Sequence, residues 1–121
     1  MVIGVTSDNY IKNSKSRIQN SEFIETFEKR KKAVLEFVKK EGVLEKTEIV
    51  KLDDIFGPTL NTNLTVDAIV VSKGTKNGAE IINKKRKELG LKDLKILVAP
   101  EVFAEDGRLI SSGRIRRGEI D

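Results

Sequence analysis

The sequence contains no cysteine, no histidine and no tryptophan among its 121 residues. The absence of cysteine excludes a disulfide scaffold, a thiolate nucleophile and every cysteine-ligated metal site. The absence of histidine excludes acid–base catalysis by imidazole, histidine metal ligands and any Ser-His-Asp triad. No aliphatic run exceeds four residues, and Met1 leads directly into an apolar segment without a basic leader. We therefore expect no membrane span, no signal peptide and a cytoplasmic location.

What the chain has in excess is charge. Charged residues make up 35% of the sequence, against about 25% in average proteins, and the net charge is +4. A chain of this length is expected to fold as one domain over residues 1–121. The basic balance leaves open a small nucleic-acid binder, but aromatic residues are only 5% and no stacking platform appears. We therefore expect no nucleic-acid partner.

Apolar blocks alternate with polar stretches along the chain. Short apolar runs, several of them β-branched, predict four strands, at 1–6, 47–52, 67–72 and 95–99. Apolar residues at helical spacing predict helices at 21–41 and 75–89. Ser21 is the expected N-cap of the first helix, and Gly42 and Gly90 follow the two helix ends as C-cap glycines.

The stretches between these elements predict loops at 7–9, 12–20 and 53–63. Residues 102–104 are expected to continue the strand pairing, and 114–118 to form a short basic helix. The order is therefore strand, helix, strand, strand, helix, strand, helix. With nearly continuous apolar strands, it predicts an α/β fold with a mostly parallel sheet and helices on both faces.

The most informative segment is Ile-Ser-Ser-Gly-Arg-Ile-Arg at 110–116. Small residues at the start of a helix leave backbone N–H groups open to an anion. Serine hydroxyls can add donors, and arginines neutralise phosphate oxygens in bidentate geometry. Arg116 follows Ser112 by about one helical turn, so it could close over a phosphate held by the serine. A serine-capped helix with a solvated basic face is the alternative interpretation.

Two further groups follow predicted strands, where ligands of parallel sheets bind. Thr6 and Ser7, with Lys12, suit a phosphorylated substrate, although from the residues alone a polar turn with surface lysines is the favoured interpretation. Asp53 and Asp54 are expected to be solvated turn residues, so we predict no metal site. The basic run at 29–32 is expected to be a solvated helix face, with Arg30 as the one member that could turn inward.

Four segments occur in a single register from Val2 to the last residue: Ile-Gly-Val-Thr-Ser-Asp at 3–8, Asp-Ile-Phe-Gly-Pro-Thr at 54–59, Asp-Ala-Ile-Val-Val-Ser at 67–72 and Ile-Ser-Ser-Gly-Arg-Ile-Arg-Arg-Gly-Glu-Ile-Asp at 110–121. Together they resemble the archaeal phosphopantetheine adenylyltransferase family of the nucleotidylyltransferase superfamily. The resemblance implies a Rossmann-like fold and transfer of AMP from ATP to 4′-phosphopantetheine. The products would be dephospho-coenzyme A and pyrophosphate, with Mg²⁺ accompanying ATP.

The resemblance also implies roles for individual residues. The residues that match the family's ATP-phosphate motif are Ser111, Ser112 and Arg116, and Ser72 and Thr75 match the segment that lines its adenosine site. The positions expected to face phosphopantetheine are Thr6, Ser7, Lys12 and Arg30. Adenylyl transfer forms no covalent enzyme intermediate, so positioning and charge neutralisation can supply most of the catalysis.

The chain departs from the family at three places. Gly113 replaces a threonine or serine, Gly74 replaces a usually acidic residue, and the family's opening strand, Gly-Thr-Phe-Asp turn and HxGH helix have no counterpart. That opening would comprise roughly 25 residues at average element lengths. Its strand is central in the family, so we expect that residues precede Met1 in the complete protein, that a second copy completes the sheet, or that the strands close up differently.

These departures leave two functional interpretations open. In the first, the protein is an adenylyltransferase, and this chain lacks the HxGH residues and is inactive alone. In the second, it is a non-catalytic relative that binds a nucleotide or anion as a regulatory or assembly module. Turnover of ATP and 4′-phosphopantetheine by a protein with its upstream residues distinguishes the two.

Overall fold

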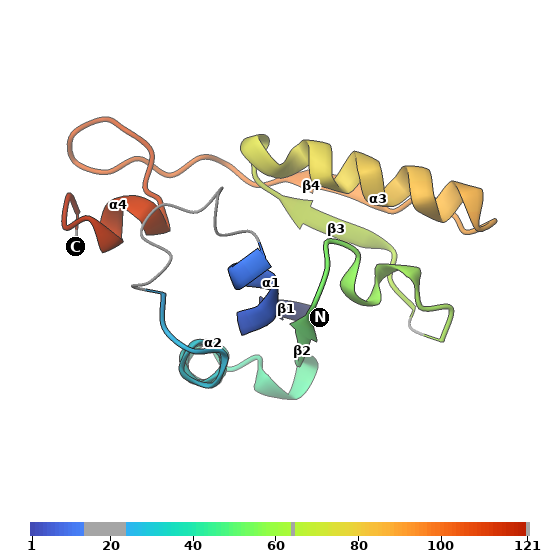
Figure 1. The fold of residues 1–121 in the computed structure, drawn as a ribbon, viewed down its shortest axis with the longest axis horizontal. Helices are drawn as coiled ribbons and strands as arrows, with labels where there is room; N and C mark the ends of the chain where they lie inside the picture. Colours follow the sequence, from blue (N-terminus) through green and yellow to red (C-terminus); the bar gives the residue numbers. More distant parts are fainter. Residues whose placement is uncertain (14–23, 64, 121) are drawn as a thin grey trace. The chain divides into compact units, whose positions relative to one another are not determined.

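The computed structural model describes residues 1–13, 24–63 and 65–120 (Figure 1). Its elements in chain order, with η marking a 3₁₀ turn, are β1 (Val2–Thr6), α1 (Asp8–Asn13), α2 (Phe27–Lys40), η3 (Leu44–Lys46), β2 (Glu48–Leu52), η4 (Gly57–Leu60), β3 (Ala68–Val71), η5 (Lys73–Thr75), α3 (Lys76–Glu88), β4 (Lys95–Val98) and α4 (Ser112–Arg116). They fall into two compact units, Met1–Gly57 and Pro58–Asp121. Within the described ranges, no helix has the length and apolar character needed to cross a bilayer.

The first unit is a parallel strand pair with a helix packed against it. β1 and β2 run in register from Val2 opposite Glu48 to Thr6 opposite Leu52. α2 packs on β1, and its Val38 is only 1% exposed. Full burial of a side chain of this kind stabilises the fold by about 1.5–3 kcal/mol. The apolar spacing in α2 therefore holds the helix on the strands.

Gly4 in β1 has a packing role. A Cβ at this position would lie 2.5 Å from Leu52 Cδ1, a separation that real Cβ atoms do not show. Leu52 therefore fills the space that any larger residue at position 4 would need. The glycine permits close packing inside the strand pair, which is one of the recognised uses of glycine in a strand.

The start of α2 differs from the prediction. The helix begins at Phe27, whereas the sequence predicted a start at Ser21, which lies outside the described residues. Thr26 is the N-cap, and its hydroxyl accepts from the backbone N–H of Lys29. The N–H of Phe27 donates to Asp8 Oδ1 at 2.8 Å. A cap supplied from so far along the chain is a tertiary contact, which local spacing does not reveal.

The predicted turn at 7–9 is wrong, because this segment begins a helix. The Ser7 hydroxyl accepts from the N–H of Tyr10 at 3.0 Å, which makes Ser7 a serine N-cap for α1. The first residues of the predicted loop at 12–20 belong to this helix, and the rest lie outside the described residues. The short helix lacks an apolar stripe, so periodicity gave no signal for it.

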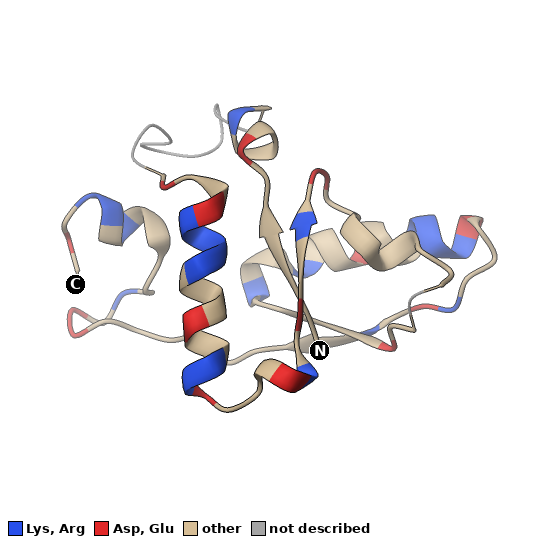
Figure 2. Cartoon of the chain, turned by 90° about the horizontal axis from the view of Figure 1, so that it is seen from below, with Lys and Arg blue, Asp and Glu red and all other residues tan. Residues whose placement is uncertain are grey.

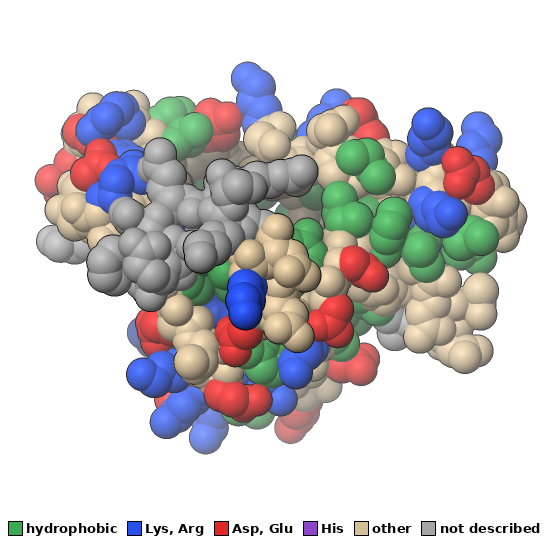
Figure 3. All heavy atoms as spheres, viewed as in Figure 1, with side chains coloured by type: hydrophobic (Ala, Val, Ile, Leu, Met, Phe, Trp, Pro, Cys, Tyr) green, Lys and Arg blue, Asp and Glu red, His purple; other side chains and the backbone are tan. Residues whose placement is uncertain are grey.

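The second unit contains the other parallel pair. β3 and β4 run in register from Ala68 opposite Lys95 to Val71 opposite Val98, and α3 packs on both strands. Its core includes Ala79, Ile82 and Leu94. Val70 and Leu97 are register partners that are 68% and 42% exposed, and apolar side chains gather over β3 in Figure 3.

The predicted α/β class with parallel strands is confirmed. The strands form two two-stranded sheets, β1-β2 and β3-β4, in place of the single sheet that was expected. Apolar patterns identify the strands, but they carry no information about which strands pair across the chain. The expectation of a single domain stays a prediction.

The predicted helix ends are confirmed. Gly42 and Gly90 have φ values of 75° and 76°, the left-handed conformation that glycine adopts most readily. After each glycine the backbone N–H returns to the helix, from Val43 to the Val38 carbonyl at 3.0 Å and from Leu91 to the Arg86 carbonyl at 2.8 Å. These bonds are those of the Schellman motif, as the Gly-Val and Gly-Leu pairs indicate.

Candidate functional site

A β-hairpin leads into the C-terminal helix. Residues 102–104 were expected to continue the strand pairing of the sheet, but Phe103 forms an antiparallel bridge with Leu109. The N–H of Ile110 donates to the Val102 carbonyl at 3.0 Å. Gly107 forms the turn with a φ of 80°. Because the partner strand is only six residues further on, the local hairpin forms in place of a sheet strand.

The helix α4 begins directly after this hairpin. Its N-cap is Ser111, whose hydroxyl accepts from the N–H of Arg114 at 3.2 Å. Ser112 is the first helical residue and is exposed. A hydroxyl that accepts one hydrogen bond still has its own proton to donate. Both serines of the motif therefore keep a donor for an anion, and the predicted short basic helix is confirmed, beginning two residues earlier.

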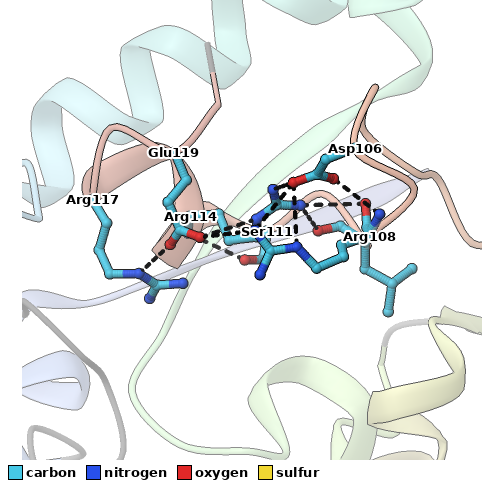
Figure 4. Close-up of polar contacts among 7 residues, drawn as sticks. Asp106, Arg108, Ser111, Arg114, Arg117 and Glu119 are labelled. Carbon is cyan, nitrogen blue, oxygen red and sulfur yellow. Dashed lines mark hydrogen bonds and ion pairs between the residues drawn. The ribbon is translucent and has the colours of Figure 1, made fainter.

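Two carboxylates and three arginines form a cluster around α4, the carboxylate–arginine cluster: Asp106, Arg108, Arg114, Arg117 and Glu119 (Figure 4). Arg114 lies at its centre and is only 6% exposed. Its guanidinium pairs with Asp106 and donates to the carbonyl of Leu109 at 2.7 Å. Its Nε lies 3.6 Å from a Glu119 oxygen. Arg114 is one of the arginines that the 110–116 segment offers to a phosphate, but in the structure it faces its own backbone.

Glu119 reaches the cluster because the chain reverses after α4. Gly118 has a φ of 75°, and the next N–H, that of Glu119, donates to the Arg114 carbonyl at 3.0 Å. This turn brings the Glu119 carboxylate onto Arg117 Nε at 2.5 Å and within 3.5 Å of Arg108. A glycine at position 118 indicates the end of a helix from the sequence alone, but the contact of Glu119 with the arginines depends on how the segment folds.

Three hydrogen-bond donors converge on Gly113. The point where a Cβ would stand lies 3.2 Å from Arg117 Nη1, 3.9 Å from Ser111 Oγ and 4.0 Å from Arg116 Nη2. The sequence predicted that Ser111 and Arg116 share a site, and the structure places both beside this one point. An arrangement of a hydroxyl and guanidiniums suits a phosphate group.

Folding lowers the pKa of both carboxylates in the cluster. The N–H of Arg108, and after it Arg114, lower the pKa of Asp106, and the hydrogen bond from Arg117 lowers that of Glu119. A carboxyl with a lowered pKa stabilises the folded state above its usual pKa and loses that contribution as the pH falls through the lowered value. We expect the ion pairs of the cluster to form at neutral pH and to break only as the pH falls below the ordinary pKa range of these carboxyls.

NMR titration of the Asp106 and Glu119 carboxyl carbons measures the pKa of each carboxyl. Both midpoints should fall below the ordinary values of aspartate and glutamate side chains, and the amide shifts of α4 should change over the same pH range. Midpoints at those ordinary values would contradict the cluster.

The second predicted nucleotide segment lies where β3 ends. Ser72 and Thr75 face each other, with their hydroxyl oxygens 3.0 Å apart, and the Ser72 N–H donates to Thr75 Oγ1 at 3.0 Å. Both residues are exposed. Gly74 between them is open, since a Cβ there would meet only Ser72 Oγ at 4.0 Å. The structure thus brings the two predicted residues together at a strand end.

In the first unit, Arg30 turns inward. Lys and Arg follow one another along α2 in Figure 2, but Arg30 reaches the carboxyl end of β1. Its Nη1 donates to the Thr6 carbonyl at 2.8 Å and to Thr6 Oγ1 at 2.9 Å, and its Nη2 lies 3.0 Å from Asp8. Its Nε donates to the Glu25 carbonyl at 2.8 Å. Two of the residues expected at the acceptor site are therefore in direct contact.

The other two residues expected there, Ser7 and Lys12, lie at the start and in the last turn of α1. Ser7 is 4% exposed and caps α1, while Lys12 is exposed at the end of the same helix. Asp54 Oδ1 accepts from the N–H groups of Phe56 and Gly57 at 2.9 Å. That pattern is an Asx turn, the solvated-turn role expected of the Asp53–Asp54 pair. Within the described ranges no group of three acidic residues could hold a metal ion.

Several archaeal proteins are similar to this chain along its whole length. A phosphopantetheine adenylyltransferase from Methanopyrus kandleri is 43% identical over 121 residues, which cover 100% of this chain and 73% of that protein. The proteins of the same name from Methanosarcina mazei and Pyrococcus abyssi are 41% and 37% identical, each over 98% of this chain and 72% of their own length. No protein-family model matches the chain.

One solved structure has a similar fold. The crystal structure of a protein with unknown function from Archaeoglobus fulgidus superposes with a TM-score of 0.63 at 33% identity, covering 81% of this chain and 72% of that one. The likeness agrees with the α/β class described above. The sequence supports the same relationship, since the adenylyltransferases named above are 37–43% identical to this chain over nearly its whole length. The chain belongs to the phosphopantetheine adenylyltransferase family.

Proposed function

We propose that the protein transfers AMP from ATP to 4′-phosphopantetheine in coenzyme A synthesis, in the cytoplasm. A phosphate oxygen of the acceptor attacks the α-phosphorus of ATP, the bond from that phosphorus to the β-phosphate oxygen breaks, and pyrophosphate leaves. The other product is dephospho-coenzyme A. The observation that carries this proposal is the similarity to enzymes of that name at about 40% identity over nearly the full chain.

The second unit supplies the residues for the nucleotide in this proposal. Ser111, Ser112 and Arg116 hold the ATP phosphates, and the convergence of Ser111 Oγ and Arg116 Nη2 on Gly113 supports it. Ser72 and Thr75 line the adenosine. Mg²⁺ enters with ATP as part of the substrate. Donors fixed before the reaction stabilise charge that develops on the phosphates without the cost of reorganising them.

The first unit supplies the residues for the acceptor. Thr6, Ser7, Lys12 and Arg30 are assigned to the phosphopantetheine. The contact of Arg30 with Thr6 at the carboxyl end of β1 supports this assignment, because ligands of parallel sheets bind beyond that end. Arg30 also fixes Asp8, so the guanidinium is held in one orientation.

The test is an assay of the complete gene product with ATP and 4′-phosphopantetheine. Dephospho-coenzyme A is detected by mass spectrometry and pyrophosphate by a coupled assay, in equal amounts. Pantetheine without its phosphate is the control, since it lacks the attacking oxygen. The 121-residue chain is assayed alongside and is expected to turn over slowly if at all, because it contains no histidine.

A folded gene product that binds ATP and forms no dephospho-coenzyme A would overturn the proposal. That result would favour the alternative of a non-catalytic relative that binds a nucleotide. Turnover that is equally fast with pantetheine as acceptor would overturn the assignment of the phosphate as nucleophile.

Gly113→Ser is expected to tighten ATP binding by about 2- to 10-fold, which corresponds to about 0.5–1.5 kcal/mol for one added hydrogen bond. The serine Cβ would lie 3.2 Å from Arg117 Nη1, the end of a flexible side chain that can shift slightly, and at ordinary contact distance from Ser111 Oγ and Arg116 Nη2. The residue therefore fits, and its hydroxyl joins those of Ser111 and Ser112. Gly113→Ala is the matched control, because it adds the Cβ without the hydroxyl. Isothermal titration calorimetry with ATP measures the effect, and equal affinities for the two variants would contradict it.

A further inference from the structure

Arg114 lies inside the motif assigned to ATP but is directed away from solvent. The side chain is 6% exposed, and it contacts two carboxylates, Asp106 and Glu119, and the carbonyls of Arg108 and Leu109. Figure 4 shows these groups around one guanidinium. The guanidinium is therefore directed at groups of the protein itself and not at the solvent, from which a phosphate would approach.

We propose that Arg114 is a positioning residue, which fixes the segment between Leu109 and Glu119 so that Ser111, Ser112 and Arg116 can receive a triphosphate. The inference rests on the proposed function. Leu109 precedes the phosphate-binding segment and Glu119 follows it. One guanidinium contacts both: it donates a hydrogen bond to the Leu109 carbonyl at 2.7 Å, and its Nε forms an ion pair with the Glu119 carboxylate at 3.6 Å. The segment is therefore fastened at its two ends to the same rigid group.

The geometry of this fastening requires arginine. Guanidinium is planar and presents five donors in a fixed fork, whereas a lysine ammonium is a single point of charge on a flexible stem. In the cluster the guanidinium contacts Asp106 in the hairpin turn, the Leu109 carbonyl in the hairpin strand and Glu119 in the chain after the helix. Lysine can keep one of these contacts but not all three. The N–H of Arg114 also donates to Ser111 Oγ, so the same residue orients a hydroxyl of the site.

The test compares the binding of inorganic triphosphate and of ATP by the full chain and its variants, using calorimetry. Arg114→Met is expected to weaken both at least 10-fold, and Arg114→Lys to retain an intermediate affinity. Glu119→Gln leaves Arg114 paired with Asp106, so it should fold normally and still bind several-fold more weakly.

Arg86→Met is the matched control. Arg86 is equally buried, at 8%, and donates to the backbone carbonyls of Lys92 and Thr59, outside the segment that carries the site. Its loss should lower the melting temperature and leave triphosphate affinity within about twofold.

In the complete gene product, Arg114→Lys is expected to raise KM for ATP and to leave KM for 4′-phosphopantetheine unchanged. A general loss of structure would change both. Unaltered triphosphate affinity in folded Arg114→Lys and Glu119→Gln, or an equal loss in Arg86→Met, would overturn the inference, and so would an unmodified chain that binds no triphosphate. If triphosphate binding depends on Arg114 but no dephospho-coenzyme A forms, the proposed function fails and the positioning role stands.

Discussion

Arg116→Ala is expected to weaken ATP binding by roughly 10- to 150-fold, corresponding to about 1.5–3 kcal/mol for hydrogen bonds to a charged group. Arg116 is half-buried, and its Nη2 lies near the point on which Ser111 Oγ also converges. The partial burial reduces screening by solvent, so loss of this guanidinium should cost more than loss of a surface charge. Calorimetry with ATP on the purified chain measures the change.

Arg117→Ala is the comparison for this prediction. Arg117 is the next residue and is exposed, and its Nε is bound to the Glu119 carboxylate. Because that carboxylate offsets its charge, we expect a loss of less than about threefold. If the two alanine variants lose equal affinity, or if neither loses any, Ser111–Arg116 is only a capped helix and the phosphate assignment is wrong.

Arg30→Met is expected to have the second largest effect, on the first unit. Arg30 makes four hydrogen bonds, two to Thr6, one to Asp8 and one to the Glu25 carbonyl. The Arg30 side chain is 20% exposed and its two contacts with Thr6 are part-buried, so removing the guanidinium leaves the Thr6 acceptors with little water to replace it. We expect a loss of about 1.5–3 kcal/mol in unfolding free energy and a rise in KM for 4′-phosphopantetheine of at least about tenfold.

Two further variants separate stability from binding. Lys32→Met removes an exposed charge from the same helix and should change neither quantity. Arg30→Lys retains the charge and part of the bonding, so urea unfolding should show partial recovery. If Arg30→Met lowers stability but leaves KM for the acceptor unchanged, Arg30 is a structural clamp and takes no part in acceptor binding.

Features that depend on neighbouring residues were predicted correctly from the sequence, and features that depend on contacts between distant residues were not. The ends of α2 and α3 were predicted correctly from Gly42 and Gly90, because a left-handed glycine with a following apolar residue is a local signal. The start of α2 was predicted wrongly: both Ser21 and Thr26 are N-cap residue types, and the contact of Asp8 with the N–H of Phe27, from nineteen positions away, is not visible in the local pattern. The hairpin at 102–110 was also missed, since residues 102–104 are compatible with either a sheet or a hairpin.

The sequence alone determined the α/β class and the identity of the strands, and it singled out the residues of the proposed nucleotide motif, because periodicity, capping glycines and motif spacing are all local. Only the tertiary structure decided that Arg114 faces the protein interior while Ser111 and Arg116 lie together beside Gly113. Three arginines within four positions of one helix are equivalent in a sequence. Their roles differ because Asp106 and Glu119 are brought to one of them by a turn at Gly107 and a helix stop at Gly118.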